Sequence, residues 1–209
     1  MDLEPVRAAL LVLAGYLAGS SPMGVVVARV TRARDPRTVG SGRTGGTNAL
    51  RAMGFRRAVT VAVLDIGKGA APVLVARLFG ADEIVQALVG IAAVIGAWRS
   101  VFLGFQGGRG LSTGIGAMLV IQPVVVLVTA PVFFAVIALS RYVSLGSLLA
   151  SAAAVCVLAI FVFLGVEDAV WLVYAVSAAL VIWLAHADNI ERLARGQEQK
   201  FSFGDRDTR

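Results

Sequence analysis

Long apolar runs, separated by short polar segments, occupy most of the chain. Seven runs are candidates for membrane-spanning helices, and they cover approximately residues 6–30, 58–79, 84–98, 111–122, 124–140, 145–164 and 169–186. A helix needs about 20 mainly apolar residues to cross the hydrocarbon core of a bilayer. The pattern therefore predicts an all-α, polytopic membrane protein with about seven transmembrane helices.

The run at 111–140 needs a further argument, because it is too long for one span. Its 30 residues, at about 1.5 Å each, would make about 45 Å of helix, and the hydrocarbon core is about 30 Å thick. Gln122-Pro123 is a plausible turn within the run. Arg109 and Arg141 flank the run and both favour the cytoplasm, so the chain crosses an even number of times between them. We therefore expect a hairpin of two short helices.

The sign of the charge alternates between the polar segments. Segment 29–57 holds eight arginines and a single acid, Asp35, which favours the cytoplasmic side. The loop near 80–83 and segment 166–168 are acidic and are predicted to lie outside. The N-terminus is then outside and the C-terminus is cytoplasmic. The loops are too short for a second domain, so residues 1–209 form one membrane domain with a short tail from about residue 187.

Composition excludes several other classes of protein. Hydrophobic residues make up 58% of the chain, charged residues make up 15%, and the mean hydropathy is +0.83. Soluble domains are about half apolar and a quarter charged. The run at 6–30 is too long for a signal peptide and is expected to remain as a span. Cys156 is the only cysteine, which excludes a disulfide framework and a cysteine metal site, and we expect no metal or cofactor. The net charge of +6 indicates anionic lipids or substrates rather than nucleic acid.

The first candidate site is a glycine-rich segment at residues 39–51. Its glycines, Gly42 among them, allow tight backbone curvature with free N–H groups, which suits the binding of an anion. Arg51 can supply a planar, bidentate fork for a phosphate. Ser41 and Asn48 add a hydroxyl and an amide to the segment. The alternative is a flexible basic loop that only touches anionic lipid.

The second candidate site is the segment 105–114, which opens a predicted helix. A glycine-rich turn at a helix N-terminus binds anions readily, and Arg109 adds a full charge to Gly107, Gly108 and Gly110. The segment is not a Walker A motif, which needs Lys followed by Ser or Thr. The alternative interpretation is a turn that only packs one helix on another.

Further polar residues lie in or beside the predicted spans. Asp65 and Lys68 are three residues apart within a span, so they can pair on one helix face, as a functional pair or a purely structural one. Ser144 lies at a predicted helix start, and His186 and Asn189 lie at the end of the last span. All three fall on the predicted cytoplasmic side, although an interfacial histidine and helix-start hydroxyls are also common without a function.

Six segments together resemble the bacterial acyl-phosphate:glycerol-3-phosphate acyltransferase family, the PlsY type. In family order they are Gly19-Ser20-Ser21-Pro22-Met23-Gly24, Val39 through Arg51, Asp65-Ile66-Gly67-Lys68-Gly69, Gly107-Gly108-Arg109-Gly110, Tyr142-Val143-Ser144-Leu145 and His186-Ala187-Asp188-Asn189-Ile190. The resemblance covers nearly the whole chain and implies a seven-helix bacterial inner-membrane enzyme with its active site facing the cytoplasm. Such an enzyme moves a fatty acyl group from acyl phosphate to the 1-hydroxyl of glycerol 3-phosphate and produces lysophosphatidic acid for phospholipid synthesis.

The resemblance also implies roles for individual residues. Ser41, Arg51, Arg109, Ser144, His186 and Asn189 would line the phosphate site, with Asn48, Lys68 and the glycines of both loops in support. The chain departs from the family pattern at several positions. Ala97 and Ser100 stand where the family has His and Pro, Arg109 stands where it has Lys, and Arg43 and Gly46 replace Asn and Ala of the first motif. An arginine in place of a lysine keeps the charge but changes the donor geometry.

These residues predict catalysis mainly by positioning and electrostatics. No Ser–His–Asp set is evident in the sequence, so we expect no acyl-enzyme intermediate, and either His186 or the phosphate of the donor would accept the hydroxyl proton. The acyl chain would lie between helices and would enter from the membrane lipids. Two alternatives remain: a transporter or scramblase for a phosphorylated solute, and a divergent, non-catalytic membrane paralogue.

Overall fold

The computed structural model describes residues 4–201, and all regular structure in that range is helical. The α-helices are α1 (Glu4–Ser20), α2 (Met23–Val30), α3 (Gly46–Met53), α4 (Phe55–Leu78), α5 (Glu83–Trp98), α6 (Leu111–Ile121), α7 (Pro123–Ser140), α8 (Val143–Phe163), α9 (Val170–Ala185) and α10 (Ala187–Ala194). Two short 3-10 helices, η1 (Pro36–Thr38) and η2 (Val101–Leu103), lie in loops. The all-α prediction is confirmed. The ends of the predicted 1–209 domain, residues 1–3 and 202–209, lie outside the described residues.

The lengths and apolar character of the helices suit a membrane. Four of the described helices are each long and apolar enough to cross a membrane: α4, α5 continued through η2, α7 and α8. The number of candidate spans rises to six if the bent pairs α1–α2 and α9–α10 each count as one span. Helix α6 has only 11 residues, which is about 16 Å of helix. The polytopic prediction is confirmed, and the number seven and the orientation of the termini stay predictions. Because α10 carries several charged residues, we treat α9 as the membrane-crossing part of its pair.

The run at 6–30 was predicted to be a single membrane-spanning helix, but it forms two helices. Helices α1 and α2 meet at Ser21-Pro22 and differ in direction by 47°. Proline lacks a backbone N–H and clashes with the preceding turn, so it breaks the helix here. Side chains bind the carbonyls that the break frees: Ser100 Oγ donates to Ser20 O at 2.5 Å, and Lys68 Nζ donates to Ser21 O at 2.9 Å. Irregular backbone inside a membrane protein requires such partners.

Two short helices lie where a loop and a tail were expected. Residues 46–53 form α3 and residues 187–194 form α10. In α3, Ala49 and Met53 are one helical turn apart, and both are buried in a small apolar cluster with residues of α2 and α4. Gly54 ends the helix with a φ of +79°, a conformation that glycine adopts without strain. Packing against neighbouring helices stabilises so short a helix.

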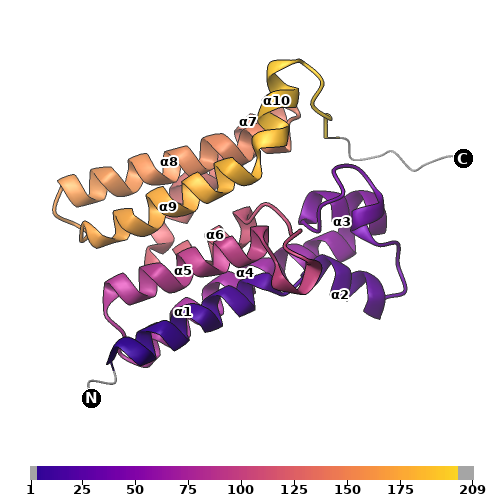
Figure 1. Cartoon of the computed structure of the whole chain (residues 1–209). Coiled ribbons are helices and arrows are strands. Elements are labelled where there is room, and N and C mark those ends of the chain that lie inside the picture. Colours follow the sequence, from indigo (N-terminus) through magenta and orange to yellow (C-terminus); the bar gives the residue numbers. More distant parts are fainter. Residues whose placement is uncertain (1–3, 202–209) are drawn as a thin grey trace, which may run out of the picture.

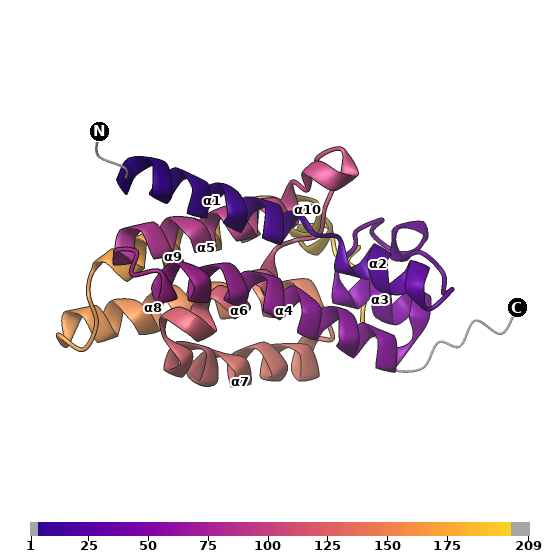
Figure 2. The same ribbon diagram turned by 90° about the horizontal axis from the view of Figure 1, so that it is seen from below.

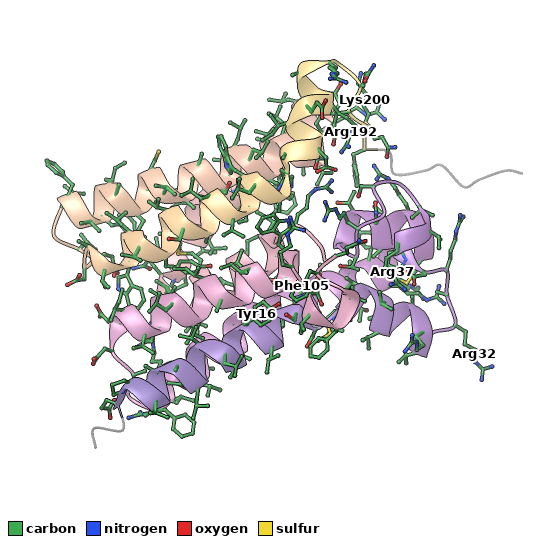
Figure 3. All side chains as sticks on the ribbon, viewed as in Figure 1. Tyr16, Arg32, Arg37, Phe105, Arg192 and Lys200 are labelled. Carbon is green, nitrogen blue, oxygen red and sulfur yellow. The ribbon has the colours of Figure 1, made fainter. Side chains whose placement is uncertain are left out.

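The helices form an elongated bundle whose two ends differ (Figures 1 and 2). Helix α1 begins at one end, whereas α2, α3 and α10 gather at the other, which also carries the labelled basic residues Arg32, Arg37, Arg192 and Lys200 (Figure 3). Gln122, at the turn between α6 and α7, donates a hydrogen bond to Glu167 in the loop between α8 and α9. The α6–α7 turn and the acidic α8–α9 loop therefore lie at the same end of the bundle, as the predicted hairpin requires.

Helix α6 is packed inside the bundle against α4 by means of two glycines. A Cβ atom at Gly69 of α4 would lie 1.9 Å from Thr113 O, and a Cβ atom at Gly116 of α6 would lie 1.9 Å from Ile66 O. Only glycine permits so close an approach of two helix backbones, which is a common device in membrane proteins. Tyr174 of α9 is buried beside α6 and donates to Gly114 O at 2.7 Å. These contacts hold the N-terminus of α6 at the basic end of the bundle.

Candidate active site

A cavity of about 270 Å³ lies at the basic end of the bundle. Its polar wall is built from the 40–51 segment, Asp65 and Lys68 of α4, the loop that precedes α6, the start of α8, the bend between α9 and α10, and the tail after α10. Ten of the twelve predicted site residues line it: Ser41, Asn48, Arg51, Lys68, Gly108, Arg109, Gly110, Ser144, His186 and Asn189. The fold thus brings these six separate polar segments together.

Four helices begin at this cavity. Gly46 of α3, Leu111 of α6 and Val143 of α8 are first residues of their helices and line the wall, and His186, which also lines it, precedes α10. The first N–H groups of a helix have no partner within the helix, and the helix dipole gives this end a partial positive charge. Among residues 4–201, no side chain caps α3 or α6. Four such ends in one wall suit an anionic ligand.

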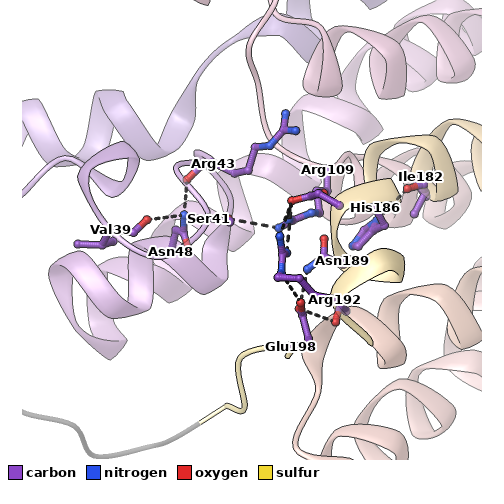
Figure 4. Close-up of polar contacts among 12 residues, drawn as sticks. Val39, Ser41, Arg43, Asn48, Arg109, Ile182, His186, Asn189, Arg192 and Glu198 are labelled. Carbon is purple, nitrogen blue, oxygen red and sulfur yellow. Dashed lines mark hydrogen bonds and ion pairs between the residues drawn. The ribbon is translucent and has the colours of Figure 1, made fainter. Parts of the chain in front are cut away.

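Asn48 holds the 39–51 segment in shape. Its Nδ2 donates to Val39 O at 3.1 Å, to Ser41 Oγ at 3.1 Å and to Arg43 O at 3.0 Å (Figure 4). Its Oδ1 accepts from Arg51 Nη1 at 3.1 Å. The residue is 3% exposed, and both the nitrogen and the oxygen of its amide take part in these contacts. Asn48 therefore orients Ser41 and Arg51, and its predicted contact with a substrate stays a prediction.

Gly40 explains why this segment needs glycine. Its φ is +53°, and a Cβ atom there would lie 2.7 Å from both Arg51 Nη1 and Asn48 Oδ1. Any side chain at this position would displace the guanidinium. Burial lowers the pKa of Arg51 and the nearby Glu198 opposes this effect, and a guanidinium remains charged at neutral pH.

Arg109 connects two distant parts of the wall. Its Nη2 donates to Asp188 Oδ2 of α10 at 2.9 Å, and its Nη1 donates to Ser41 Oγ at 3.4 Å. Burial lowers the pKa of Arg109 and Asp188 raises it. Among the residues that the structure describes, no acceptor lies within hydrogen-bonding distance of the buried Nε. One donor of this guanidinium is therefore left for a ligand.

The predicted roles of three glycine amides need correction. The N–H groups of Gly107 and Gly108 donate to Trp98 O and Ala97 O at 2.9 and 2.8 Å, and that of Gly42 donates to Val39 O at 3.0 Å. These amides are committed to the backbone and cannot cradle a phosphate. Gly42 and Gly107 also lie outside the cavity wall. They shape the two loops, and the free N–H groups come from the helix starts instead.

Lys68 lines the cavity, but its contacts serve the fold. Its Nζ lies 2.7 Å from Asp65 Oδ1 and donates to Ser21 O at 2.9 Å. The expected pairing of Asp65 with Lys68 on one face of α4 is confirmed. Because the ammonium also binds the carbonyl at the α1–α2 break, it fastens α4 to that break.

His186 is held in one tautomer by a backbone carbonyl. Its Nδ1 lies 2.8 Å from Ile182 O, and the ring is 3% exposed. A carbonyl oxygen only accepts, so Nδ1 carries the proton and Nε2 of the neutral ring holds a lone pair. The ring lines the cavity, where burial disfavours its charged form.

Arg43, Arg192 and Glu198 also line the cavity, although they were not among the predicted site residues. Glu198 lies in the tail and accepts hydrogen bonds from Ser144, Asn189 and Arg192 (Figure 4). Charge alone could have suggested the two arginines. No local pattern singles out Glu198, because its partners are spread over 54 residues of chain. Of the described residues, five cationic and two acidic side chains line the cavity: Arg43, Arg51, Lys68, Arg109, Arg192, Asp65 and Glu198.

An apolar groove adjoins the cavity. It also measures about 270 Å³ and lies between α6, α7, α8 and α9. Leu111 and Phe133 line both spaces. From these two residues the groove extends along α6 to Met118 and along α8 to Ala154. A polar, cationic space and an apolar one thus share two wall residues.

Most of the chain matches proteins of a known family. The family model for glycerol-3-phosphate acyltransferase matches residues 9–196. The chain belongs to the glycerol-3-phosphate acyltransferase family. A family member from Anaeromyxobacter sp. (strain Fw109-5) is 42% identical over 202 residues, which cover 94% of this chain and 98% of the relative. One from Myxococcus xanthus (strain DK1622) is 46% identical over 192 residues, with 91% and 98% covered.

Two solved structures of family members resemble this fold. Both are crystal structures of PlsY (YgiH), an integral membrane glycerol 3-phosphate acyltransferase. The glycerol 3-phosphate form has a TM-score of 0.85 and 37% identity, and the lysophosphatidic acid form has a TM-score of 0.82 and 35% identity. Each comparison covers 94% of this chain and 96% of the solved chain.

The structure accommodates the departures from the family motifs. Ser100 is 2% exposed, and its hydroxyl donates to Ser20 O, so the buried hydroxyl at this position has a partner. At position 97 the backbone carbonyl, rather than the side chain, makes the contact to Gly108. Arg109 spans both Asp188 and Ser41, which its fork of donors permits.

Proposed function

We propose that this protein transfers a fatty acyl group from acyl phosphate to the 1-hydroxyl of glycerol 3-phosphate. The products are lysophosphatidic acid and inorganic phosphate. The acyltransferase activity follows from membership of the family across nearly the whole chain. The choice of acyl phosphate as the donor, and the roles of individual residues, are our inference from the charge and shape of the site.

The observation that carries the proposal is the cavity in which Arg109 keeps one buried donor without an acceptor among the described residues. Arg51 and Arg43 line the same wall, together with the starts of α3 and α6. Guanidinium groups and helix N-termini are well suited to binding phosphate. A surplus of cationic side chains suits two phosphorylated substrates, which would repel one another elsewhere.

The adjoining groove supports a lipid-derived donor. Its apolar walls can hold the acyl chain, while Leu111 and Phe133 mark the point where chain and phosphate meet. The carbonyl carbon of the donor then lies at the boundary between groove and cavity. Holding two substrates in this arrangement replaces an encounter in solution by a reaction between fixed neighbours, which can supply much of the rate enhancement.

The reaction needs no covalent intermediate with the protein. The 1-hydroxyl oxygen attacks the carbonyl carbon of the donor, a new C–O ester bond forms, and the bond between that carbon and the phosphate oxygen breaks. The hydroxyl proton passes to the departing phosphate. Arg51, Arg109 and the helix starts stabilise the negative charge that the leaving phosphate gains. His186 is the alternative proton acceptor, although its burial opposes formation of an imidazolium ion.

We further propose that the site faces the cytoplasm across a bacterial inner membrane. The arginine-rich segments surround the cavity, and arginine and lysine favour the cytoplasmic side of a membrane protein. An impermeant thiol reagent should label an Arg32→Cys variant only after the cytoplasmic side is opened. Labelling of intact cells would contradict this orientation.

The experiment that tests the proposal uses purified wild-type protein with glycerol 3-phosphate and one of three donors: acyl phosphate, acyl-coenzyme A or an acylated carrier protein. Mass spectrometry identifies the product. We expect 1-acyl lysophosphatidic acid from acyl phosphate alone. Equal or faster reaction with a thioester donor would contradict the assignment of the donor. Transport of glycerol 3-phosphate into vesicles without product would favour a transporter.

A further inference from the structure

The tail after α10 returns to the cavity wall through one side chain. Glu198 Oε1 accepts from Ser144 Oγ at 2.8 Å and from Asn189 Nδ2 at 2.6 Å, and its Oε2 accepts from Arg192 Nε at 2.7 Å (Figure 4). The side chain is 8% exposed. Burial alone would raise the pKa of Glu198, but the hydrogen bonds from Asn189, Arg192 and Ser144 lower it below its ordinary value. The group is therefore a carboxylate at neutral pH.

A carboxylate fixes the orientation of the amide that it binds. It can only accept hydrogen bonds, so the NH₂ group of Asn189 must face Glu198. The carbonyl oxygen Oδ1 must then occupy the other position of the amide. A neutral partner at position 198 would remove this constraint, because an amide or a hydroxyl both donates and accepts.

The fixed Oδ1 is a buried acceptor at the cavity. Asn189 is 4% exposed and lines the cavity wall. Within the described part of the chain, no donor lies within hydrogen-bonding distance of Oδ1. A buried acceptor without a donor is unfavourable, so a ligand that fills the cavity should donate to it. The phosphate groups of both proposed substrates are acceptors when ionised, and the hydroxyls of the glycerol are the donors that remain.

We propose that Glu198 is a positioning residue, which orients Asn189 so that its Oδ1 accepts a hydrogen bond from a hydroxyl of the glycerol substrate. This inference rests on the proposed function. The polar wall of the cavity then has two parts, which bind different groups of the substrates. Arg51 and Arg109 bind phosphate, whereas Asn189, held by Glu198, recognises the alcohol. The contact aligns the glycerol relative to the acyl carbonyl without forming a covalent bond.

Exchange of the two polar groups tests the proposal. In Asn189→Asp, two carboxylates face one another, and we expect kcat/KM for glycerol 3-phosphate to fall at least about a hundredfold. In Glu198→Gln, the amide of Asn189 can turn over, and we expect a fall of about tenfold or more. In the double variant, the new amide at position 198 can donate to the new carboxylate at position 189, whose second oxygen then faces the cavity. We expect the double variant to recover at least about tenfold over Asn189→Asp.

A role of Glu198 in holding the tail alone would give a different pattern. It would lower the melting temperature and the yield of folded protein, while kcat/KM per folded molecule would stay unchanged. Arg141→Ala is the matched control, because Arg141 Nε donates to Phe201 O and Arg141 does not line the cavity. This variant loosens the same tail without touching Asn189, and we expect its kcat/KM to equal that of the wild type.

Two results would overturn the inference. One is a Glu198→Gln variant that keeps the wild-type kcat/KM for glycerol 3-phosphate. The other is a folded double variant that is no more active than Asn189→Asp. The wild type serves as the reference for the proposed function itself. If the wild type forms no lysophosphatidic acid, the proposed function fails, whereas an active wild type without rescue contradicts only the role of Glu198.

Discussion

Arg109 Nη2 lies 2.9 Å from Asp188 Oδ2, although 79 residues of chain separate the two. The contact joins the loop before α6 to α10, and Arg192 binds the same carboxylate at 3.2 Å. Burial alone would raise the pKa of Asp188, but Arg109 and Arg192 lower it. The aspartate is therefore charged at neutral pH and holds the guanidinium of Arg109 at the cavity wall.

Removal of the Arg109 guanidinium should impair catalysis strongly. We expect Arg109→Ala to lower kcat/KM about a hundredfold or more, because a charged donor to the phosphates is lost. Arg109→Lys keeps the charge and restores the usual residue of the family, so its loss should stay within about tenfold. Steady-state kinetics of the purified variants measure both effects. Arg32→Ala, an exposed arginine outside the cavity, is the control and should behave as the wild type.

The size of the fall in kcat when His186 is replaced tests whether this residue is the general base. A general base usually contributes about a hundredfold or more to a rate. If the donor phosphate accepts the proton, His186→Gln should lower kcat by less than about tenfold, because the ring then only lines the cavity. We expect this small effect. A fall of about a hundredfold in a variant that still folds and binds glycerol 3-phosphate would assign the proton to Nε2 of His186.

The groove between α6 and α9 should determine the length of the acyl chain. Ala154 lines its far end, distant from Leu111 at the cavity. A phenylalanine at position 154 would fill that end, so Ala154→Phe should shift the preference of the enzyme towards shorter acyl phosphates. Competition between donors of different length, analysed by mass spectrometry, measures the shift. Leu149→Phe on the same helix is outside the groove and 44% exposed, and it should leave the preference unchanged.

The close contact of α4 and α6 predicts a large difference between two neighbouring glycines. A Cβ atom at Gly69 would lie 1.9 Å from Thr113 O, whereas a Cβ atom at Gly67 would have no atom within 4 Å. Gly69→Ala should destabilise the protein by about 1–3 kcal/mol or more, because the helices must separate. Gly67→Ala should be neutral or stabilising, since alanine is the better helix former. Thermal unfolding in detergent distinguishes them, and equal melting temperatures would contradict the observed packing.

The sequence was informative where a physical constraint acts locally. Long apolar runs predicted the main helices, because a membrane requires them whatever their partners. The positions of Gln122-Pro123 and Glu167 agreed with the predicted hairpin. The break at Pro22 was missed, because apolar residues continue on both sides of it and hydropathy does not report on backbone geometry. Helix α3 was missed because its stability comes from the contacts of Ala49 and Met53 with distant helices.

The sequence predicted most of the residue types that line the candidate site. It predicted the role of each group less well. Arginines in separate basic segments indicated an anion site, and the fold brings them into one cavity. The amides of Gly42, Gly107 and Gly108 were expected to be free, but each has a carbonyl partner that depends on the folded loop. Glu198 was not predicted, because a single acidic residue in a polar tail forms no sequence pattern that indicates a function. Its importance is visible only in the hydrogen bonds that it accepts.

The central claim is that phosphate binding at this cavity and acyl transfer are one function, and Arg51 tests it most directly. The measurement compares the formation of lysophosphatidic acid from acyl phosphate and glycerol 3-phosphate by purified wild type and Arg51→Ala, with their melting temperatures as a check on folding. We predict that the wild type forms lysophosphatidic acid and inorganic phosphate in equal amounts, and that the folded variant is slower by about a hundredfold or more. Equal rates for the two proteins would contradict the account.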